Sequence, residues 1–330
     1  MAMSQLSGRQ SLRDIQSNLE SQRHKLYHLG AKPIPRSTLA RINEKQPAAL
    51  YQALFGRLLQ HCKSLPGRHK FRFKNPLYSL DASAIDLSLK LFPWAAYRPD
   101  AGNMKLSVGL NHGTDVPEFV ALGDGNENDL VQGRRFAFPK SSIVVFDKGY
   151  VDYGWYKSLT DQGVFFVTRL RPNSIYRVEE RRPVDRSKGL TCDQTIQLNS
   201  AHALKRGAPR LRRVGFVDRE TGKHYVFLTN HFGLSAATIA ALYKDRWRIE
   251  IFFKTIKQNL KIKAFVGTSR NAVLTQLWIA MITYLLVAFA RHSARAGWTV
   301  QRIMRVLQLS LFDRRTLAEI LNPDPGRSKK

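Results

Sequence analysis

Cysteine is nearly absent from this 330-residue chain, which contains only Cys62 and Cys192. Neither belongs to a Cys-x2-Cys pair or to the Cys and His spacing of a zinc finger, so neither a disulfide scaffold nor a structural zinc site is expected. The N-terminal segment MAMSQLSGRQSLRDIQ lacks the apolar run of a secretory signal, and internal repeats and low-complexity tracts are also lacking. These absences predict a folded protein of the reducing cytoplasm.

Acidic residues are scarce, with 25 Asp and Glu against 53 Lys and Arg and a net charge of +28. A small acidic metabolite does not require so much positive charge. A polyanion does, because each Lys or Arg that neutralises a phosphate releases counterions. The charge therefore favours nucleic acid as the partner. An anionic membrane surface is the weaker alternative, since no basic amphipathic helix stands apart from the fold.

The longest apolar run extends from Ala272 to Ala290 and is about long enough to cross a bilayer. It contains Thr275, Gln276 and Thr283, and helices that are apolar all round also occupy the cores of large proteins. We therefore expect a buried core helix and no membrane partner.

Residues 1–75 predict an N-terminal helical module. The expected helices are 11–28, a second that begins at an N-cap of Ser37 or Thr38, and a third from Ala48 to Leu59. Because the module carries Arg36 and Arg41, it suits a helix-turn-helix-like DNA reader. A plain helical cap with solvated charges fits equally well.

Residues 76–170 change to strand patterns and predict the first part of an α/β core. Ile85, Leu87 and Leu89 alternate with polar residues, as do the apolar residues of segment 105–111. The run 143–147 (IVVFD) is continuously apolar, which is typical of a strand buried on both faces. A short helix follows around Trp155 and Leu159, and then a second buried strand at 164–170, so β-α-β units in a mixed sheet are predicted.

Residues 171–222 interrupt this core. Segment 171–213 has eleven Lys and Arg against four acidic residues, and it predicts a basic, β-rich insertion or an irregular surface excursion. Residues 223–322 form the second part of the core, with a strand at 224–230 and a helix that Ser235 caps and that runs to about Leu260. Residues 323–330 form a basic tail.

Four polar residues recur along that helix: Tyr243, Arg246, Glu250 and Lys257. At roughly 100° per residue they project within an arc of about 60°, at the edge of the apolar face. A site can form at such an edge. The alternative is a solvated Arg246–Glu250 ion pair, worth only a few tenths of a kcal/mol.

Two aspartates follow apolar strand residues: Asp81 in LYSLDAS and Asp147 in IVVFD. Asp147 emerges at the carboxyl end of its strand, where α/β sites usually lie. With Glu250 they can converge on Mg²⁺ or Mn²⁺, which prefer hard oxygen ligands. Two such ions about 3.5–4 Å apart support phosphodiester chemistry. Taken singly, each Asp is more often a turn or cap residue.

The spacing Tyr243-x2-Arg246-x3-Glu250-x6-Lys257 resembles the signature of the DDE transposases of the insertion-sequence-four family. The stretch FDKGYVDYGWYKSLTDQGVFFVTRLRPN resembles the second-Asp region of that family, with Lys148 where arginine is usual.

Two further stretches carry the resemblance from about Arg36 to Leu321. SLDASAIDLSLKLFPWA resembles the first-Asp region, and RSTLARINEKQ resembles the N-terminal module of one branch. Asp86 competes with Asp81 for the first-Asp position, and Asp81 better matches the family's Asp-small-Ser/Thr context.

The resemblance implies a ribonuclease-H-like mixed-sheet core with a β-rich insertion between the second Asp and the Glu. It implies a catalytic triad of Asp81, Asp147 and Glu250 that holds two Mg²⁺ or Mn²⁺ ions. The expected DNA-binding residues are Tyr243, Arg246, Lys257, Lys148, Arg36 and Arg41.

The function implied is cleavage at the ends of an insertion sequence and strand transfer of the 3′-hydroxyl ends into target DNA. A homodimer would pair two transposon ends, in the bacterial cytoplasm and at the nucleoid when bound to DNA. A nuclease or resolvase of the ribonuclease H fold would share the carboxylates without needing the Tyr-Arg-Glu-Lys spacing. A catalytically silent or domesticated DNA-binding protein would leave the carboxylates idle.

Overall fold

The computed structural model describes residues 2–8, 11–27, 30–65, 67, 69–260, 262, 265–294 and 297–322. The chain divides into two compact units. The first comprises Met1–Pro66, Ala84–Lys105 and Phe252–Lys330, and the second comprises Gly67–Ser83 and Leu106–Ile251. Three elements have residues in both units: β1 (Leu77–Leu87), β3 (Ala101–Asn111) and α10 (Trp247–Asn259).

The second unit is built on a mixed sheet with the strand order β3-β1-β5-β6-β10-β9-β8-β7, and β4 pairs with β3. Its further strands are β4 (Pro117–Asp124), β5 (Ile143–Phe146), β6 (Phe165–Arg169), β7 (Tyr176–Arg182), β8 (Leu190–Leu198), β9 (Leu211–Val217) and β10 (His224–Thr229). Its helices are α6 (Asp129–Arg134), α7 (Tyr153–Asp161), α8 (Ala201–Lys205) and α9 (Ala236–Asp245). The pairs β1–β5 and β5–β6 are parallel, and the strands from β6 to β7 in the sheet order pair antiparallel.

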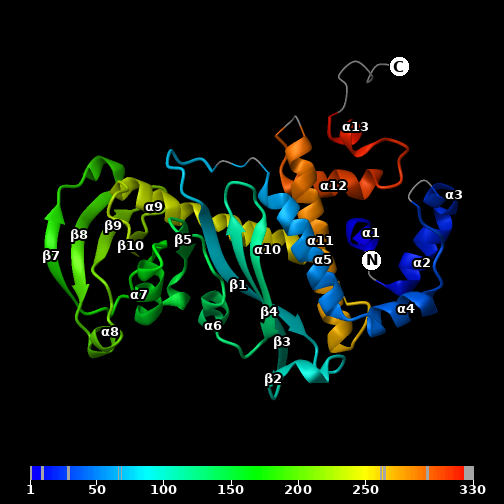
Figure 1. Ribbon diagram of the computed structural model, residues 1–330, viewed down its shortest axis with the longest axis horizontal. Helices are drawn as coiled ribbons and strands as arrows, with labels where there is room; N and C mark the ends of the chain where they lie inside the picture. Colours follow the sequence, from blue (N-terminus) through cyan, green and yellow to red (C-terminus); the bar gives the residue numbers. More distant parts are fainter. Residues whose placement is uncertain are drawn as a thin grey trace. The chain divides into compact units, whose positions relative to one another are not determined.

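Strand β5 is apolar at every position because helices cover both faces of the sheet (Figure 1). Val144 and Phe146 pack in a cluster with Trp155 of α7. Ile143 and Val145 pack in the opposite cluster, which contains the apolar side of α9. The prediction of a strand buried on both faces is therefore confirmed for this run.

The chain between β6 and β10 adds strands β7, β8 and β9 to the sheet, so this basic segment is β-rich and not irregular. A buried ion pair joins two of them. The Arg212 Nε and NH2 atoms of β9 lie 2.8 and 2.6 Å from the Asp193 carboxylate of β8, and the two side chains are only 4% and 6% exposed. The same guanidinium donates to the carbonyls of Phe232 and Leu234, which fixes these strands to the loop before α9.

The first unit is mainly helical. Its elements are α1 (Ala2–Leu6), α2 (Leu12–Ser21), α3 (Arg23–Leu26), α4 (Arg36–Lys45), α5 (Ala48–Lys63), the short strand β2 (Ala96–Arg98), α11 (Arg270–Ser293), α12 (Val300–Ser310) and α13 (Leu317–Leu321). Helix α11 packs along α5 (Figure 1) and also contacts α1, α4, α12 and α13. It is long and apolar enough to cross a membrane by length and composition, but 83% of its apolar window is buried in the protein, as expected for a core helix.

Two details of the predicted N-terminal helices are wrong. Helix α4 begins at Arg36, so Ser37 and Thr38 lie inside its first turn and do not cap it. The chain turns from extended into helical at Pro35, whose φ of −58° and ψ of 144° place it outside the helix. The helix predicted for 11–28 is divided at Gln22, and residue 28 lies outside the described residues.

Candidate active site

Two of the predicted carboxylates leave neighbouring parallel strands at the same level of the sheet. In the pairing of β1 with β5, Leu80 is opposite Phe146. Asp81 and Asp147 are the next residues on the two strands, so the register brings them to adjacent positions. The Asp147 side chain accepts a hydrogen bond from the Gly149 amide and begins the turn Lys148–Tyr150.

Arg246 joins the first of these carboxylates to the predicted glutamate. Its NH1 atom lies 3.2 Å from Asp81 Oδ2, and its NH2 atom lies 2.6 Å from Glu250 Oε1. The arginine side chain is 14% exposed, whereas Asp81 and Glu250 are 25% and 32% exposed. The ion pair predicted within the helix is therefore present, but it is part of a three-residue cluster and is not an isolated surface pair.

Burial dominates the electrostatics of Asp81. It raises the pKa of this carboxyl from 3.8 to about 6, while the Ala82 amide and Arg246 lower it and the charges of Asp147 and Glu250 raise it. A buried carboxyl with other carboxylates nearby is a group that gains from a cation, since a cation offsets both the burial and the repulsion.

The helix that carries the Tyr-Arg-Glu-Lys spacing is not continuous, in contrast to the prediction. α9 ends at Asp245 and α10 begins at Trp247, with Arg246 between them at a helical φ of −52° and ψ of −29°. Its amide donates to the Tyr243 carbonyl three residues back, at 3.2 Å, which tightens the turn at this point. The interruption falls on the residue whose side chain bridges Asp81 and Glu250.

The other members of the spacing lie on either side of this turn. Tyr243 is half-buried, its ring centre is 5.0 Å from that of Phe227, and the Arg246 guanidinium lies 5.7 Å from its ring centre. Burial raises the pKa of the Tyr243 phenol. Lys257 is partly exposed, seven residues after Glu250 on α10.

A pocket of about 650 Å³ opens beside Asp147 within the second unit. Lys148, which is exposed, lies on its wall together with Arg171, Tyr153 and Asn173. Lys148 is a predicted DNA contact, but Arg171 was not singled out, because one more arginine in a basic segment gives no signal of its own.

Tyr150 is a second residue to which the sequence assigned no role. It follows Asp147 by three positions and is 1% exposed, and its ring packs on Phe146 at 5.9 Å. Its hydroxyl finds no hydrogen-bond partner within the described part of the chain. Burial and the nearby charges of Asp81 and Asp147 raise the pKa of this phenol, so it stays protonated.

The three predicted metal ligands do not converge on one point. Among the described residues, no three side chains of His, Cys, Asp or Glu are grouped so that they could hold a metal ion. Two of the predicted ligands, Asp81 and Glu250, instead share the guanidinium of Arg246.

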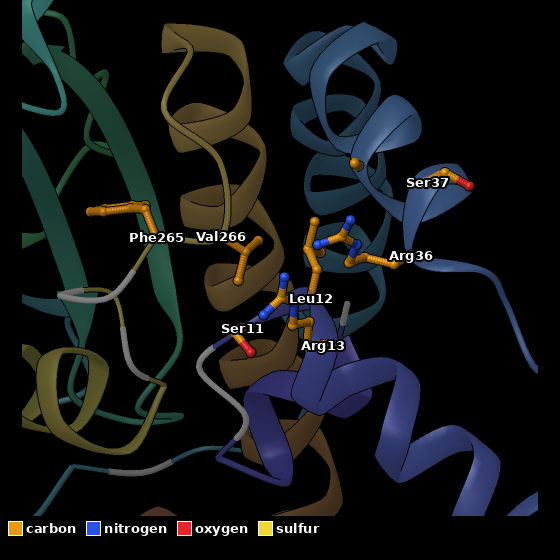
Figure 2. Close-up of a pocket in the computed structure, with 8 residues that line it drawn as sticks. Ser11, Leu12, Arg13, Arg36, Ser37, Phe265 and Val266 are labelled. Carbon is orange, nitrogen blue, oxygen red and sulfur yellow. The ribbon is translucent and has the colours of Figure 1, made fainter.

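The predicted DNA contacts of the N-terminal helices lie in the first unit. Arg36 is exposed and lines a pocket of about 400 Å³ between α2, α4 and the segment before α11 (Figure 2). Arg13 lines the same pocket from α2 (Figure 2), and the apolar lining residues are Leu12, Ala40, Phe265 and Val266. Arg41 is exposed on α4 but does not line this pocket.

The chain matches a known protein family over the residues of this site. The family model described as "Transposase DDE domain" matches residues 73–286, which include all three predicted triad residues. This chain belongs to the DDE transposase family. It is therefore an enzyme with the nuclease and strand-transferring chemistry of that family, its partner is DNA, and domains of this family generally use divalent metal ions. A second model, a domain of unknown function, matches residues 1–32.

Relatives along most of the chain bear names that agree with this family. A Sinorhizobium fredii protein named as transposase y4zB is 35% identical over 87% of this transposase and 80% of its own length. A Geobacillus stearothermophilus protein named as transposase for insertion sequence element IS5377 is 28% identical over 76% of this chain and 66% of its own. The piggyBac transposase synaptic complex with hairpin DNA, solved by cryo-EM, is 13% identical with a TM-score of 0.44, over 90% of this chain and 67% of that chain. A likeness at that level carries no conclusion.

Proposed function

We propose that this transposase is a cut-and-paste enzyme of the insertion-sequence-four family, with Asp81, Asp147 and Glu250 as its catalytic triad. The observation that carries the proposal is the cluster around Arg246. Asp81 and Asp147 occupy adjacent positions on parallel strands, and Arg246 links Asp81 to Glu250 at 3.2 and 2.6 Å. The triad positions expected from the sequence are thus all in one unit of the fold.

The strand order supports a ribonuclease-H-like core. Strands β4, β3 and β1 follow one another in the sheet, and β5 and β6 continue it as parallel neighbours of β1. Asp81 lies on the central strand of this group, and Asp147 at the end of the adjacent one. We assign residues 76–170 and 223–322 to this core, 171–222 to its insertion and 1–75 to a DNA-binding module.

The donor set fits a divalent metal. The three groups are carboxylates, which Mg²⁺ and Mn²⁺ prefer, and one of them is buried enough to hold its proton up to a pH of about 6. Arg246 already occupies a cation position between Asp81 and Glu250. Asp81, Asp147 and Glu250 would hold the metal ions, which would supply Lewis-acid activation of a water or hydroxyl and neutralise charge at the phosphodiester.

Arg246 holds two of the three carboxylates, and its charge persists at every working pH. The remaining basic groups act on DNA. Lys148 and Arg171, on the wall of the pocket beside Asp147, provide positive charge for the phosphates of a strand that passes the carboxylates. Tyr243 and Lys257 extend this contact along α9 and α10. Arg36 and Arg41 provide the charge of the N-terminal module, and a homodimer pairs two transposon ends.

The test is cleavage of the element's own end DNA by the purified protein in Mg²⁺, with cut sites mapped on both strands. We expect cuts at the element boundary, no cuts by Asp147→Ala, and wild-type cutting by Asp86→Ala, since Asp86 is exposed on the same strand as Asp81. Joining of the new 3′-hydroxyl ends to a target plasmid tests strand transfer. Binding without cleavage, with two ends present and also in Mn²⁺, would instead indicate a catalytically silent DNA-binding protein.

A further inference from the structure

A second polar cluster lies behind the triad, within the same unit. Ser79 Oγ is 2.6 Å from His112 Nε2, and His112 Nδ1 is 2.8 Å from Asp245 Oδ2. The three residues come from β1, from the position after β3 and from the end of α9. The proposed chemistry uses none of them.

The order Ser–His–Asp is that of a hydrolase triad, but burial excludes this role. Ser79 and His112 are 0% and 1% exposed, so no substrate reaches the hydroxyl. Burial lowers the pKa of His112, which favours the neutral ring. Although burial acts against it, the hydrogen bonds from His112 and Lys70 hold the pKa of Asp245 at about 2. The neutral ring thus donates from Nδ1 to the carboxylate and accepts the Ser79 proton at Nε2.

Both ends of this chain of hydrogen bonds lead directly to the proposed active site. Ser79 precedes Asp81 by two residues, and side chains two apart on a strand point to the same face. Asp245 directly precedes Arg246 and stands five residues before Glu250.

The turn between α9 and α10 has two different sides. At roughly 100° per residue, Asp245 and Arg248 project about 60° apart, on the side away from Arg246 and Glu250. Arg248 donates to the His112 carbonyl at 2.6 Å and pairs with Asp115. One side of the turn is therefore bound to the strands, and the other presents the active-site groups.

We propose that Ser79, His112 and Asp245 are positioning residues of the transposase, which fix the turn bearing Arg246 and Glu250 to the strand bearing Asp81. The inference rests on the proposed triad. Groups that hold metal ligands in place through hydrogen bonds typically change metal affinity or activity about 10- to 100-fold when they are removed. Loss of the Ser79–His112–Asp245 connection should thus weaken metal binding without affecting DNA contacts made elsewhere.

The experiment measures three quantities on the full-length protein: Mn²⁺ affinity by calorimetric titration, end-DNA affinity, and the single-turnover cleavage rate. We expect Ser79→Ala and Asp245→Ala to weaken Mn²⁺ binding and slow cleavage about tenfold or more, with end-DNA affinity within about twofold of wild type. Asp245→Asn keeps an acceptor oxygen for His112 Nδ1, and its Mn²⁺ affinity should fall between those of Asp245→Ala and wild type.

Ser107→Ala is the matched control. Ser107 is also a fully buried strand serine of this unit, and its hydroxyl donates to the Gln132 side chain. It should lose stability comparably to Ser79→Ala, by thermal unfolding, and keep the wild-type Mn²⁺ affinity. Should Ser79→Ala not fold, Asp245→Asn supplies the measurement.

Two different results separate the two proposals. If Asp147→Ala bound Mn²⁺ as tightly as wild type, the proposed triad would be refuted, and the positioning role that rests on it would be refuted as well. If Asp147→Ala weakened Mn²⁺ binding but Ser79→Ala and Asp245→Ala did not, the proposed function would stand and only the positioning role would be overturned. Equal weakening by Ser107→Ala would likewise overturn it.

Discussion

Replacing the proposed catalytic Asp81 with asparagine should make the metal-free protein more stable. Its carboxyl has a pKa of about 6 in the fold, against 3.8 ordinarily, and burial is the main cause. A carboxyl with a raised pKa binds its proton more tightly in the folded chain than in the unfolded chain. The free energy of unfolding therefore falls as the pH rises from about 4 to about 6, and it stays lower above that range.

The magnitude follows from the two pKa values. The difference between 3.8 and about 6, at about 1.4 kcal/mol per pH unit, corresponds to roughly 3 kcal/mol of lost stability at neutral pH. That figure already includes the attraction of Arg246, which lowers the pKa of the carboxyl. Asparagine resembles the protonated acid in shape and carries no charge. Asp81→Asn should thus gain about 2–3 kcal/mol at pH 7.5 and almost nothing at pH 4.

Urea denaturation at several pH values, without divalent metal, checks this expectation. The difference between Asp81→Asn and wild type should grow between pH 4 and 6 and be constant above. Asp86→Asn is the control, because it makes the same change at an exposed position of the same strand, and it should alter stability by less than about 0.5 kcal/mol. Added Mn²⁺ should stabilise wild type and not Asp81→Asn. A variant destabilised equally at every pH would refute the reasoning.

Three further changes test other parts of the fold and site. Glu250→Gln should keep end-DNA binding and lose cleavage, and loss of both together would argue against a catalytic role. Lys257→Ala and Lys148→Ala should each reduce the slope of log affinity against log salt by about one, and an unchanged slope would contradict phosphate contact. Arg212→Leu removes the buried, bidentate partner of Asp193 and leaves it only the longer contact with Arg182 at 3.4 Å, so it should cost about 3 kcal/mol in urea denaturation. A loss under 1 kcal/mol would show that this ion pair does not hold the insertion.

The patterns that the sequence revealed were local ones. A continuous apolar run followed by Asp147 predicted a central strand that ends in a carboxylate, and both faces of β5 are in fact covered. The alternation at Ile85 and Leu87 predicted a strand here, but Leu89 of the same alternation lies beyond Leu87, where β1 ends. Both signals, the continuous apolar run and the two-residue alternation, are visible in a short window of sequence. Strand β4 was missed, because its residues are mostly half-buried and give no clear alternation.

The features of the site that the sequence did not predict depend on contacts between residues that are distant in the chain. His112 and Asp245 are 133 residues apart, so no motif spacing relates them. The register that places Leu80 opposite Phe146 is a property of the pair of strands, so it cannot be predicted from the sequence of either strand alone. The interruption at Arg246 has no local cause in the form of Gly or Pro between residues 243 and 250. It accompanies the side-chain contacts of Arg246 with Asp81 and Glu250, which only the folded chain creates.

The same turn of helix shows how a strongly basic protein can keep an acidic site in working order. On the side that faces the strands, Asp245 and Arg248 are tied by hydrogen bonds to His112 and its neighbours. On the other side, Arg246 and Glu250 are 14% and 32% exposed and remain within reach of solvent. A preorganised catalytic group requires both: neighbouring residues that hold it rigidly and a side that the substrate can reach. The two sides of the turn thus have separate partners: Asp245 and Arg248 bind the strands, whereas Arg246 pairs with the proposed catalytic carboxylates Asp81 and Glu250.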